Sequence, residues 1–244
     1  IVDGITSIGA VPVSMDEFKV DVFITGSQKC LETPPGLSFV ALSEPIINRL
    51  RRYFRNDKPS LEMMSGYYSH LAIYLYSWIK KKDLPFTGAV PLYYALQESL
   101  RMILEEGIEK RYRRISMMSS MLKRSIRAMG LKLLLEVKDT VDVEKYASPT
   151  VTAVWYPDTL RNPEMDKKFR DTIRSLGVLI AGGQAELKGK IFRIATMGRV
   201  GPREIITTIG AVEYALLKLG YKPQKSGLAD ALEFMIGTDL GEII

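Results

Sequence analysis

The sequence is poor in the residues that build disulfides and metal sites. It has one cysteine, Cys30, and one histidine, His70. One cysteine excludes an internal disulfide and a multi-cysteine metal site, and this is typical of a reducing compartment, so we expect a cytoplasmic protein. One histidine removes most histidine-based zinc sites, so no metal is expected, and it disfavours a serine-hydrolase triad. The uncharged stretch at residues 67–79 is too short to span a bilayer.

The overall composition indicates an ordinary globular protein. Of the 244 residues, 46% are hydrophobic and 25% charged, which excludes disordered and collagen-like classes. The net charge of +6 favours anionic ligands but is too small to indicate a nucleic-acid partner. One basic cluster, Lys110, Arg111, Arg113 and Arg114, could bind a polyanion, but we expect a solvated helix face there.

The first part of the chain alternates short apolar runs with turn residues. Strands are predicted at residues 21–25 and 37–42, which are separated by a polar turn and a Pro-Pro-Gly turn. Such runs with helices between them predict an open α/β sheet, whose ligands lie beyond the carboxyl ends of its strands. Asp3 and Lys29 stand at two such ends.

The remainder predicts helices followed by a smaller α/β unit. Helical patterns begin at Glu44, cover residues 63–82, and start again at Pro91, passing Gly107 in a second segment towards Gly130. Strands are predicted at 150–156, 178–181 and 190–196, and helices at 166–176 and 202–219. We therefore expect two domains, residues 1–106 and 107–244, joined by a long helix.

Lys29 is the first candidate for chemistry. A lysine at a strand's carboxyl end can point into the ligand crevice, where partial desolvation lowers its pKa and makes the amine nucleophilic. On spacing alone, an ordinary surface lysine in a turn is the simpler interpretation.

A wider pattern resembles a known family. The segments that carry it are Asp3-Gly-Ile-Thr-Ser-Ile-Gly, Asp21, Gly26-Ser-Gln-Lys29, Pro34-Pro-Gly36 and Lys190-Ile-Phe-Arg193-Ile. Together they resemble the class V aminotransferases, fold type I pyridoxal-phosphate enzymes, and in particular the alanine/serine–glyoxylate and serine–pyruvate aminotransferases. The resemblance implies the C-terminal part of a large, mostly parallel cofactor-binding domain (1–106) and a small C-terminal α/β domain (107–244). It also implies that an N-terminal portion, with a phosphate-gripping turn and a ring-stacking aromatic, is absent from this sequence.

The resemblance further implies roles for individual residues. Lys29 would hold pyridoxal 5'-phosphate as a Schiff base and move the substrate proton. Asp3 would pair with the pyridine nitrogen, although a simple turn residue is the alternative. Ile5 would pack on the ring, and Gln28 and Thr87 would bind the phosphate. Because the Thr87 position reaches the neighbouring subunit's site in this family, a homodimer with shared active sites is implied.

Arg193 lies in an apolar strand and needs an anionic partner. A bidentate grip on a substrate α-carboxylate meets that need, and a structural ion pair is the alternative. The resemblance implies the first alternative, in which Arg193 binds the substrate carboxylate.

Some residues depart from the family pattern. A tyrosine that often precedes the Thr87 position is absent, and Cys30 after the lysine is similar to 2-aminoethylphosphonate–pyruvate transaminases. Gln28 stands where cysteine desulfurases place histidine, so that activity is not expected. Cys30 and His70 themselves are interpreted as structural.

The expected function is a pyridoxal-phosphate aminotransferase that moves the amino group of L-serine or L-alanine to pyruvate or glyoxylate by a ping-pong mechanism. A 2-aminoethylphosphonate–pyruvate-type transaminase and a truncated, non-catalytic chain are the alternatives. Neither a nucleic acid nor a membrane is an expected partner.

Overall fold

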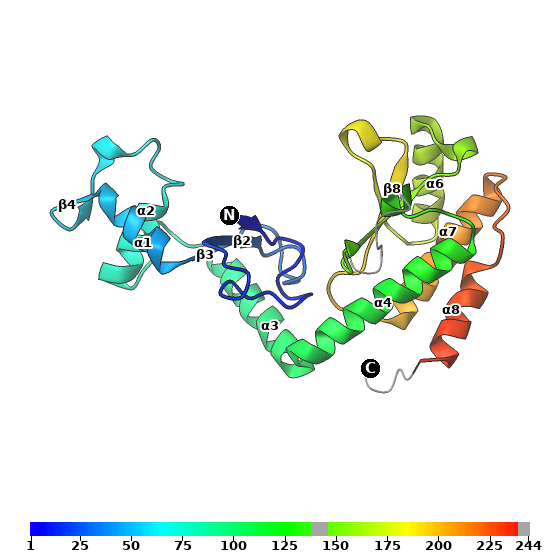
Figure 1. The fold of residues 1–244 in the computed structure, drawn as a ribbon, viewed down its shortest axis with the longest axis horizontal. Coiled ribbons are helices and arrows are strands. Elements are labelled where there is room, and N and C mark those ends of the chain that lie inside the picture. Colours follow the sequence, from blue (N-terminus) through cyan, green and yellow to red (C-terminus); the bar gives the residue numbers. More distant parts are fainter. Residues whose placement is uncertain (138–145, 239–244) are drawn as a thin grey trace. The chain divides into compact units, whose positions relative to one another are not determined.

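The computed structural model describes residues 1–137 and 146–238. The chain divides into two compact units, which are described separately: unit 1 comprises residues 1–8 and 12–102, and unit 2 comprises residues 9–11 and 103–244. In Figure 1 unit 1 runs from blue to green and unit 2 from green to red. Within the described ranges, no helix combines the length and the apolar character needed to cross a membrane.

Unit 1 contains a three-stranded sheet in the order β1-β2-β3. The strands are β1 (Val2–Asp3), β2 (Val22–Gly26) and β3 (Ser38–Leu42). The last two lie within one residue of their predicted positions. β1 pairs with β2 in parallel, and β2 pairs with β3 antiparallel, so the sheet in this chain is mixed. The parallel pair matters for the site because the carboxyl ends of parallel strands lie at one edge.

Gly4 allows these two strands to meet closely. A Cβ atom at Gly4 would lie 1.8 Å from Cε1 of the buried Phe23, so no side chain fits there. The Gly4 amide donates to the Ile24 carbonyl (2.7 Å), and the Thr25 hydroxyl donates to the Gly4 carbonyl (3.3 Å). The turn after β1 is therefore fixed against β2.

Helices and a small hairpin complete unit 1. They are α1 (Glu44–Leu50), η1 (Arg51–Tyr53), β4 (Phe54–Arg55), β5 (Lys58–Pro59), η2 (Leu61–Met63), α2 (Leu71–Tyr76), the π-helix η3 (Ser77–Lys81) and α3 (Val90–Glu106), whose last residues belong to unit 2. The helix predicted for residues 63–82 is wrong in its first part, because α2 begins only after His70. The His70 Nδ1 accepts a hydrogen bond from the Ala72 amide (3.3 Å) and so caps the helix, which is a structural role.

Unit 2 is built on an antiparallel sheet in the order β6-β8-β7. The strands are β6 (Val151–Trp155), β7 (Ala181–Gly182) and β8 (Ile191–Ala195). The helices are α4 (Ile108–Ala128), η4 (Leu134–Val137), η5 (Asp158–Leu160), α6 (Pro163–Ser175), η6 (Ala185–Leu187), α7 (Pro202–Lys218) and α8 (Gly227–Ile236). Most predicted segments agree within three residues, but the strand predicted at 178–181 is reduced to the two residues of β7.

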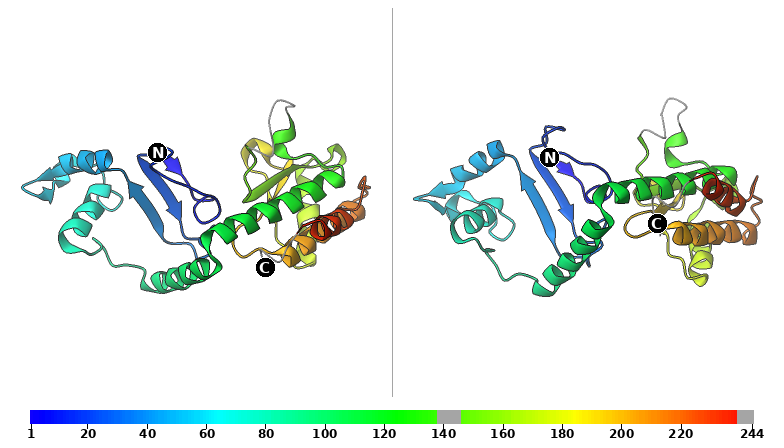
Figure 2. Two further views of the ribbon diagram at one scale, coloured as in Figure 1. Left: turned by 60° about the horizontal axis from the view of Figure 1, so that its bottom comes forward. Right: turned by 90° about the horizontal axis from the view of Figure 1, so that it is seen from below.

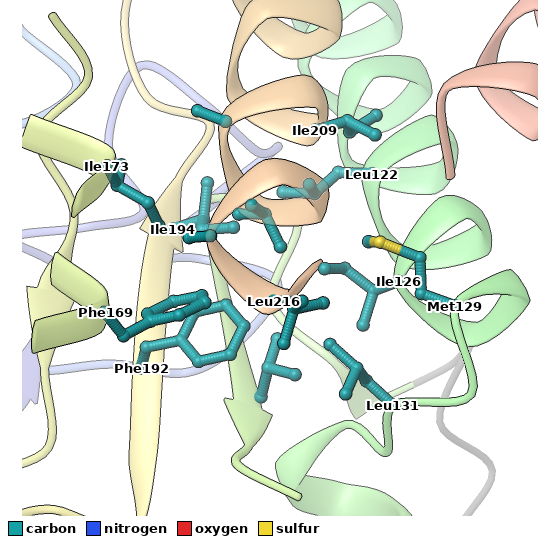
Figure 3. Close-up of a cluster of buried hydrophobic side chains, with 14 of the residues drawn as sticks. Leu122, Ile126, Met129, Leu131, Phe169, Ile173, Phe192, Ile194, Ile209 and Leu216 are labelled. Carbon is teal, nitrogen blue, oxygen red and sulfur yellow. The ribbon is translucent and has the colours of Figure 1, made fainter. Parts of the chain in front are cut away.

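The core of unit 2 lies between its sheet and its helices. In Figure 3, Phe169 of α6 and Phe192 of β8 lie beside each other, facing Leu216 of α7 and Ile126 of α4. The two phenyl centroids are 5.1 Å apart. Figure 2 shows α4, α7 and α8 side by side in green, orange and red, and all three pack on one another. Because strand side chains alternate, Phe192 and Ile194 face this core while Arg193 lies on the opposite face.

The basic cluster on α4 differs from the prediction. The Arg111 side chain is fully buried and Arg114 is 8% exposed, so the expectation of a solvated helix face is wrong for both. Buried guanidinium groups are unavailable to a polyanion. Arg113, by contrast, is exposed. Arg111 and Arg114 can be buried because a carboxylate, Glu106, lies at the end of α3, one residue before the bend at Gly107.

Glu106 binds both buried arginines. Its Oε1 accepts from Arg114 Nε (2.6 Å), and its Oε2 accepts from Arg114 Nη2 (3.0 Å) and Arg111 Nη1 (3.2 Å). Two other nitrogens donate to backbone carbonyls: Arg111 Nε to Gly9 (2.6 Å), and Arg114 Nη1 to Gly198 (3.0 Å) and Val200 (2.7 Å). One buried ion cluster thus fixes residues 9–11, the end of α3, the start of α4 and the loop before α7.

Candidate active site

Two turns of unit 1, which follow the parallel strands β1 and β2, lie against each other. The Asp3 carboxylate accepts a hydrogen bond from the Ile5 amide through Oδ1 (2.9 Å), which orients the carboxylate. The Ile5 and Gln28 side chains meet over Gly26: a Cβ atom there would lie 2.7 Å from Gln28 Oε1 and 3.3 Å from Ile5 Cδ1. Asp3, Ile5 and Gln28 are therefore brought together, as parallel pairing requires.

The turn that carries Lys29 is held by its neighbours. The Ser27 hydroxyl donates to the Pro34 carbonyl (2.7 Å), and the Thr33 amide donates to the Ser27 carbonyl (3.0 Å). Cys30 is fully buried, and its thiol donates to the Thr6 carbonyl (3.3 Å), which joins the turn after β2 to the turn after β1. The structural role expected for Cys30 agrees with this contact.

Lys29 itself is exposed, as are Asp3 and Gln28. The partial desolvation expected from its place at a strand end is therefore not supplied by the residues the structure describes. Within those residues the Lys29 Nζ has neither a hydrogen bond nor an ion pair. What the fold provides is a hydrogen-bonded turn that carries an exposed lysine.

Thr87 lies elsewhere in unit 1, exposed in the loop between η3 and α3. No hydrogen bond in the described part of the chain joins it to the two turns. The preceding Phe86 packs among three tyrosines, Tyr67, Tyr68 and Tyr74, with ring centroids 4.9 to 5.8 Å away. This aromatic cluster was not predicted from the sequence, although the three nearby tyrosines were a signal.

Arg193 lies in unit 2, on the central strand β8. Its neighbours across the sheet are Ala153 of β6 and Ala181 of β7, whose small side chains leave room for the long arginine. The side chain is partly buried, and its Nε donates to the Gly182 carbonyl (2.9 Å). Among the described residues no carboxylate pairs with Arg193, so the structural ion pair considered as an alternative is not formed there.

Comparison with known proteins identifies the family. The profile of the aminotransferase class-V family matches residues 1–152. An uncharacterised aminotransferase of Methanocaldococcus jannaschii is 37% identical over 97% of this chain and 57% of its own. The serine–glyoxylate aminotransferase of Methylorubrum extorquens is 29% identical over 96% of this chain and 55% of its own. The crystal structure of the ureidoglycine–glyoxylate aminotransferase of Bacillus subtilis superposes with a TM-score of 0.80, at 30% identity, over 96% of this chain and 56% of its own.

This chain belongs to the class V aminotransferase family and has the α/β architecture of the fold type I, pyridoxal-phosphate-dependent enzymes. It spans a little over half the length of these relatives. The family resemblance inferred from the Asp3 and Lys29 segments is thereby confirmed.

Proposed function

We propose that this chain provides the lysine-bearing part of an aminotransferase that moves the amino group of a small L-amino acid, L-serine or L-alanine, to glyoxylate or pyruvate by a ping-pong mechanism. Residues 1–106 would be the C-terminal part of the large cofactor-binding domain and residues 107–244 the small domain. The observation that carries the proposal is the meeting of Asp3, Ile5 and Gln28 beside the Lys29 turn.

These residues fit pyridoxal 5'-phosphate. Because Gly26 has no side chain, Gln28 Oε1 and Ile5 Cδ1 can lie only 2.7 and 3.3 Å from where a Cβ atom would be. Ile5 offers an apolar surface for a ring, Gln28 offers an amide for the phosphate, and Asp3 offers an oriented carboxylate for a protonated ring nitrogen. When bound, the cofactor supplies an aldehyde that reacts with amines and a ring that accepts electrons.

The chain's own groups would then act as follows. The Lys29 amine acts as the nucleophile that anchors the cofactor, and once released it carries the proton to and from the substrate α-carbon. Asp3 keeps its partner nitrogen protonated. Arg193, on the small-domain sheet, binds the substrate α-carboxylate, for which a guanidinium is suited in charge and shape.

The choice of substrates rests on the relatives. Two of those named above use glyoxylate according to their names, while their amino donors differ. Glyoxylate therefore has more support as the acceptor than any single amino acid has as the donor. Transamination between 2-aminoethylphosphonate and pyruvate, suggested by Cys30, is the competing assignment.

The test is an assay of the purified chain, and of any longer polypeptide that contains it, with added cofactor. Serine, alanine and 2-aminoethylphosphonate are supplied as donors, each with glyoxylate or pyruvate, and both products are quantified. We expect serine or alanine with glyoxylate or pyruvate to react fastest. Fastest turnover of the phosphonate would select the competing assignment, and no turnover by any polypeptide would refute transamination.

Gly26→Ala is expected to weaken cofactor binding without unfolding the protein. The new methyl group would displace the Gln28 and Ile5 side chains, both able to move, and so remove contacts worth about tenfold in the dissociation constant. Titration of the cofactor's visible absorbance measures this. Gly210→Ala on α7 is the matched control, since its Cβ meets the nearest atom at an ordinary 3.5 Å. Equal affinities in both variants would contradict a role of the Gln28 and Ile5 side chains in binding the cofactor.

We further propose a homodimer in which Thr87 contributes to the neighbouring subunit's phosphate site. Mixing inactive Lys29→Ala chains with Thr87→Val chains then creates one site with both residues intact. We expect mixed dimers to bind the cofactor with wild-type affinity at half of their sites and to regain activity above that of either variant. No gain on mixing would place Thr87 in its own subunit's site or outside the site altogether.

A further inference from the structure

The Arg193 side chain is held at one nitrogen by the neighbouring strand. Its Nε donates to the carbonyl oxygen of Gly182 (2.9 Å), which belongs to β7 at the edge of the sheet. A guanidinium carries five N–H groups, so this bond leaves the four on Nη1 and Nη2. Within the described part of the chain, those two terminal nitrogens have no hydrogen-bond or ion-pair partner.

Gly182 lies close to the side chains of Asp166 and Arg170 on α6. A Cβ atom there would lie 3.2 Å from Arg170 Nε and 3.3 and 3.4 Å from the two Asp166 oxygens. Arg170 binds Asp166 at both oxygens (3.0 and 2.8 Å), and the fully buried Tyr156 donates its hydroxyl to Asp166 Oδ1 (2.9 Å). Burial and the neighbouring carboxylate raise the pKa of Tyr156, so the phenol keeps the proton that it donates. The Asp166–Arg170 ion pair of α6 thus lies next to Gly182, whose backbone is also paired with Phe192 of β8.

We propose that Gly182 is a positioning residue for substrate recognition: its carbonyl fixes the plane of the Arg193 guanidinium so that Nη1 and Nη2 receive the substrate carboxylate end-on. The inference rests on the proposed function, in which Arg193 binds that carboxylate. A side-on grip would need Nε, which Gly182 already holds. The residues paired with Arg193 across the sheet, Ala153 and Ala181, both have small side chains.

Nuclear magnetic resonance of the full chain tests the contact without any catalytic activity. The Arg193 Nε–H signal should exchange slowly with water in the wild type and in the Gly210→Ala control, because it is hydrogen-bonded. In Gly182→Ala the added methyl group would lie too close to Arg170 and Asp166, so we expect the Gly182 carbonyl to shift by a few tenths of an ångström. The weakened hydrogen bond should speed exchange of the Arg193 Nε–H severalfold. Fast exchange in the wild type would overturn the inference, whether or not the protein transaminates.

Kinetics of the transaminating polypeptide test the consequence. Gly182→Ala should raise the KM for both substrates about 2- to 10-fold, which is the net effect of one hydrogen bond, and leave kcat within about twofold. Added pyruvate, as the carboxylate probe, should move the wild-type Nη signals and leave Nε–H protected.

Arg193→Lys separates the two ways in which these claims can fail. If this variant raises KM but Gly182→Ala does not, the positioning role is refuted and the proposed role of Arg193 stands. If Arg193→Lys leaves KM unchanged, Arg193 does not bind the carboxylate, and both claims are refuted. Displacement of the Nε–H signal by pyruvate would instead show a side-on grip and overturn the inference alone.

Discussion

Replacing Glu106 with alanine is expected to lower the free energy of unfolding by about 3–5 kcal/mol, the usual loss when one partner of a buried ion pair is removed. The side chains of Arg111 and Arg114 are 0% and 9% exposed, and Glu106 is the carboxylate that both bind. Without it, two buried positive charges would lose the carboxylate that they share. Equilibrium unfolding in urea measures the difference.

Glu98→Ala is the matched control for this substitution. Glu98 lies on the same helix, α3, and pairs with Arg101, but both side chains are more than half exposed, so little change is expected. An equal loss of stability in the two variants would show that the buried cluster stabilises the fold no more than an exposed ion pair does.

The pH dependence of stability gives a second readout of Glu106. Burial opposes its ionisation, but the hydrogen bonds and charges of Arg114 and Arg111 outweigh burial and lower its pKa. A lowered pKa in the folded state contributes stability above the unfolded value, near 4.3, that is lost as the pH falls through the folded value. We therefore expect the difference in free energy of unfolding between the wild type and Glu106→Gln to be largest near pH 7 and to decrease as the pH falls. A difference independent of pH would contradict this role.

Lys29→Ala is expected to abolish the visible absorbance of protein-bound cofactor and to slow transamination by about 10⁴-fold or more, the upper range for a positioned acid–base group. The effect should fall on chemistry and not on folding, since the Lys29 side chain is exposed and makes no hydrogen bond or ion pair with the described residues. Its fixed turn, however, is built by the buried Ser27 and Cys30. Absorbance, single-turnover rates and thermal unfolding are measured together.

Lys58→Ala, at an exposed position on β5, is the control for loss of a positive charge from unit 1. It should keep both the absorbance and the rate. If Lys29→Ala retained the absorbance and turned over at the rate of Lys58→Ala, another residue would be the nucleophile, and the assignment carried by the Gly26–Lys29 turn would be wrong.

Local pattern was sufficient for the strands that carry the site. Apolar runs of about five residues, each ended by Gly and polar turn residues, predicted β2 and β3 to within one residue. The same reasoning located β6, β8 and α7, because binary pattern and Pro or Gly boundaries are local properties. It failed at residues 63–70, where apolar residues suggested a helix that His70 begins only later.

Local pattern was not sufficient for the arginines. A run of Lys and Arg on α4 predicts a solvated face. The sequence does not show that residues 9–11 and the loop at 198–200 contact two of these arginines. Burial of a charge depends on partners far away in sequence, and the one that binds both guanidinium groups, Glu106, lies beyond a helix bend.

The sequence by itself therefore determined the family, the positions of the main strands and helices, and the candidates Asp3, Lys29 and Arg193, since all of these follow from neighbours along the chain. Only the tertiary structure decided that Ile5 and Gln28 meet over Gly26 and that Gly182 holds Arg193. It also decided that Arg111 and Arg114 are internal. Each of these depends on groups far apart in the sequence. The fold decides which backbone carbonyls, carboxylates and glycines come within a few ångströms of one another.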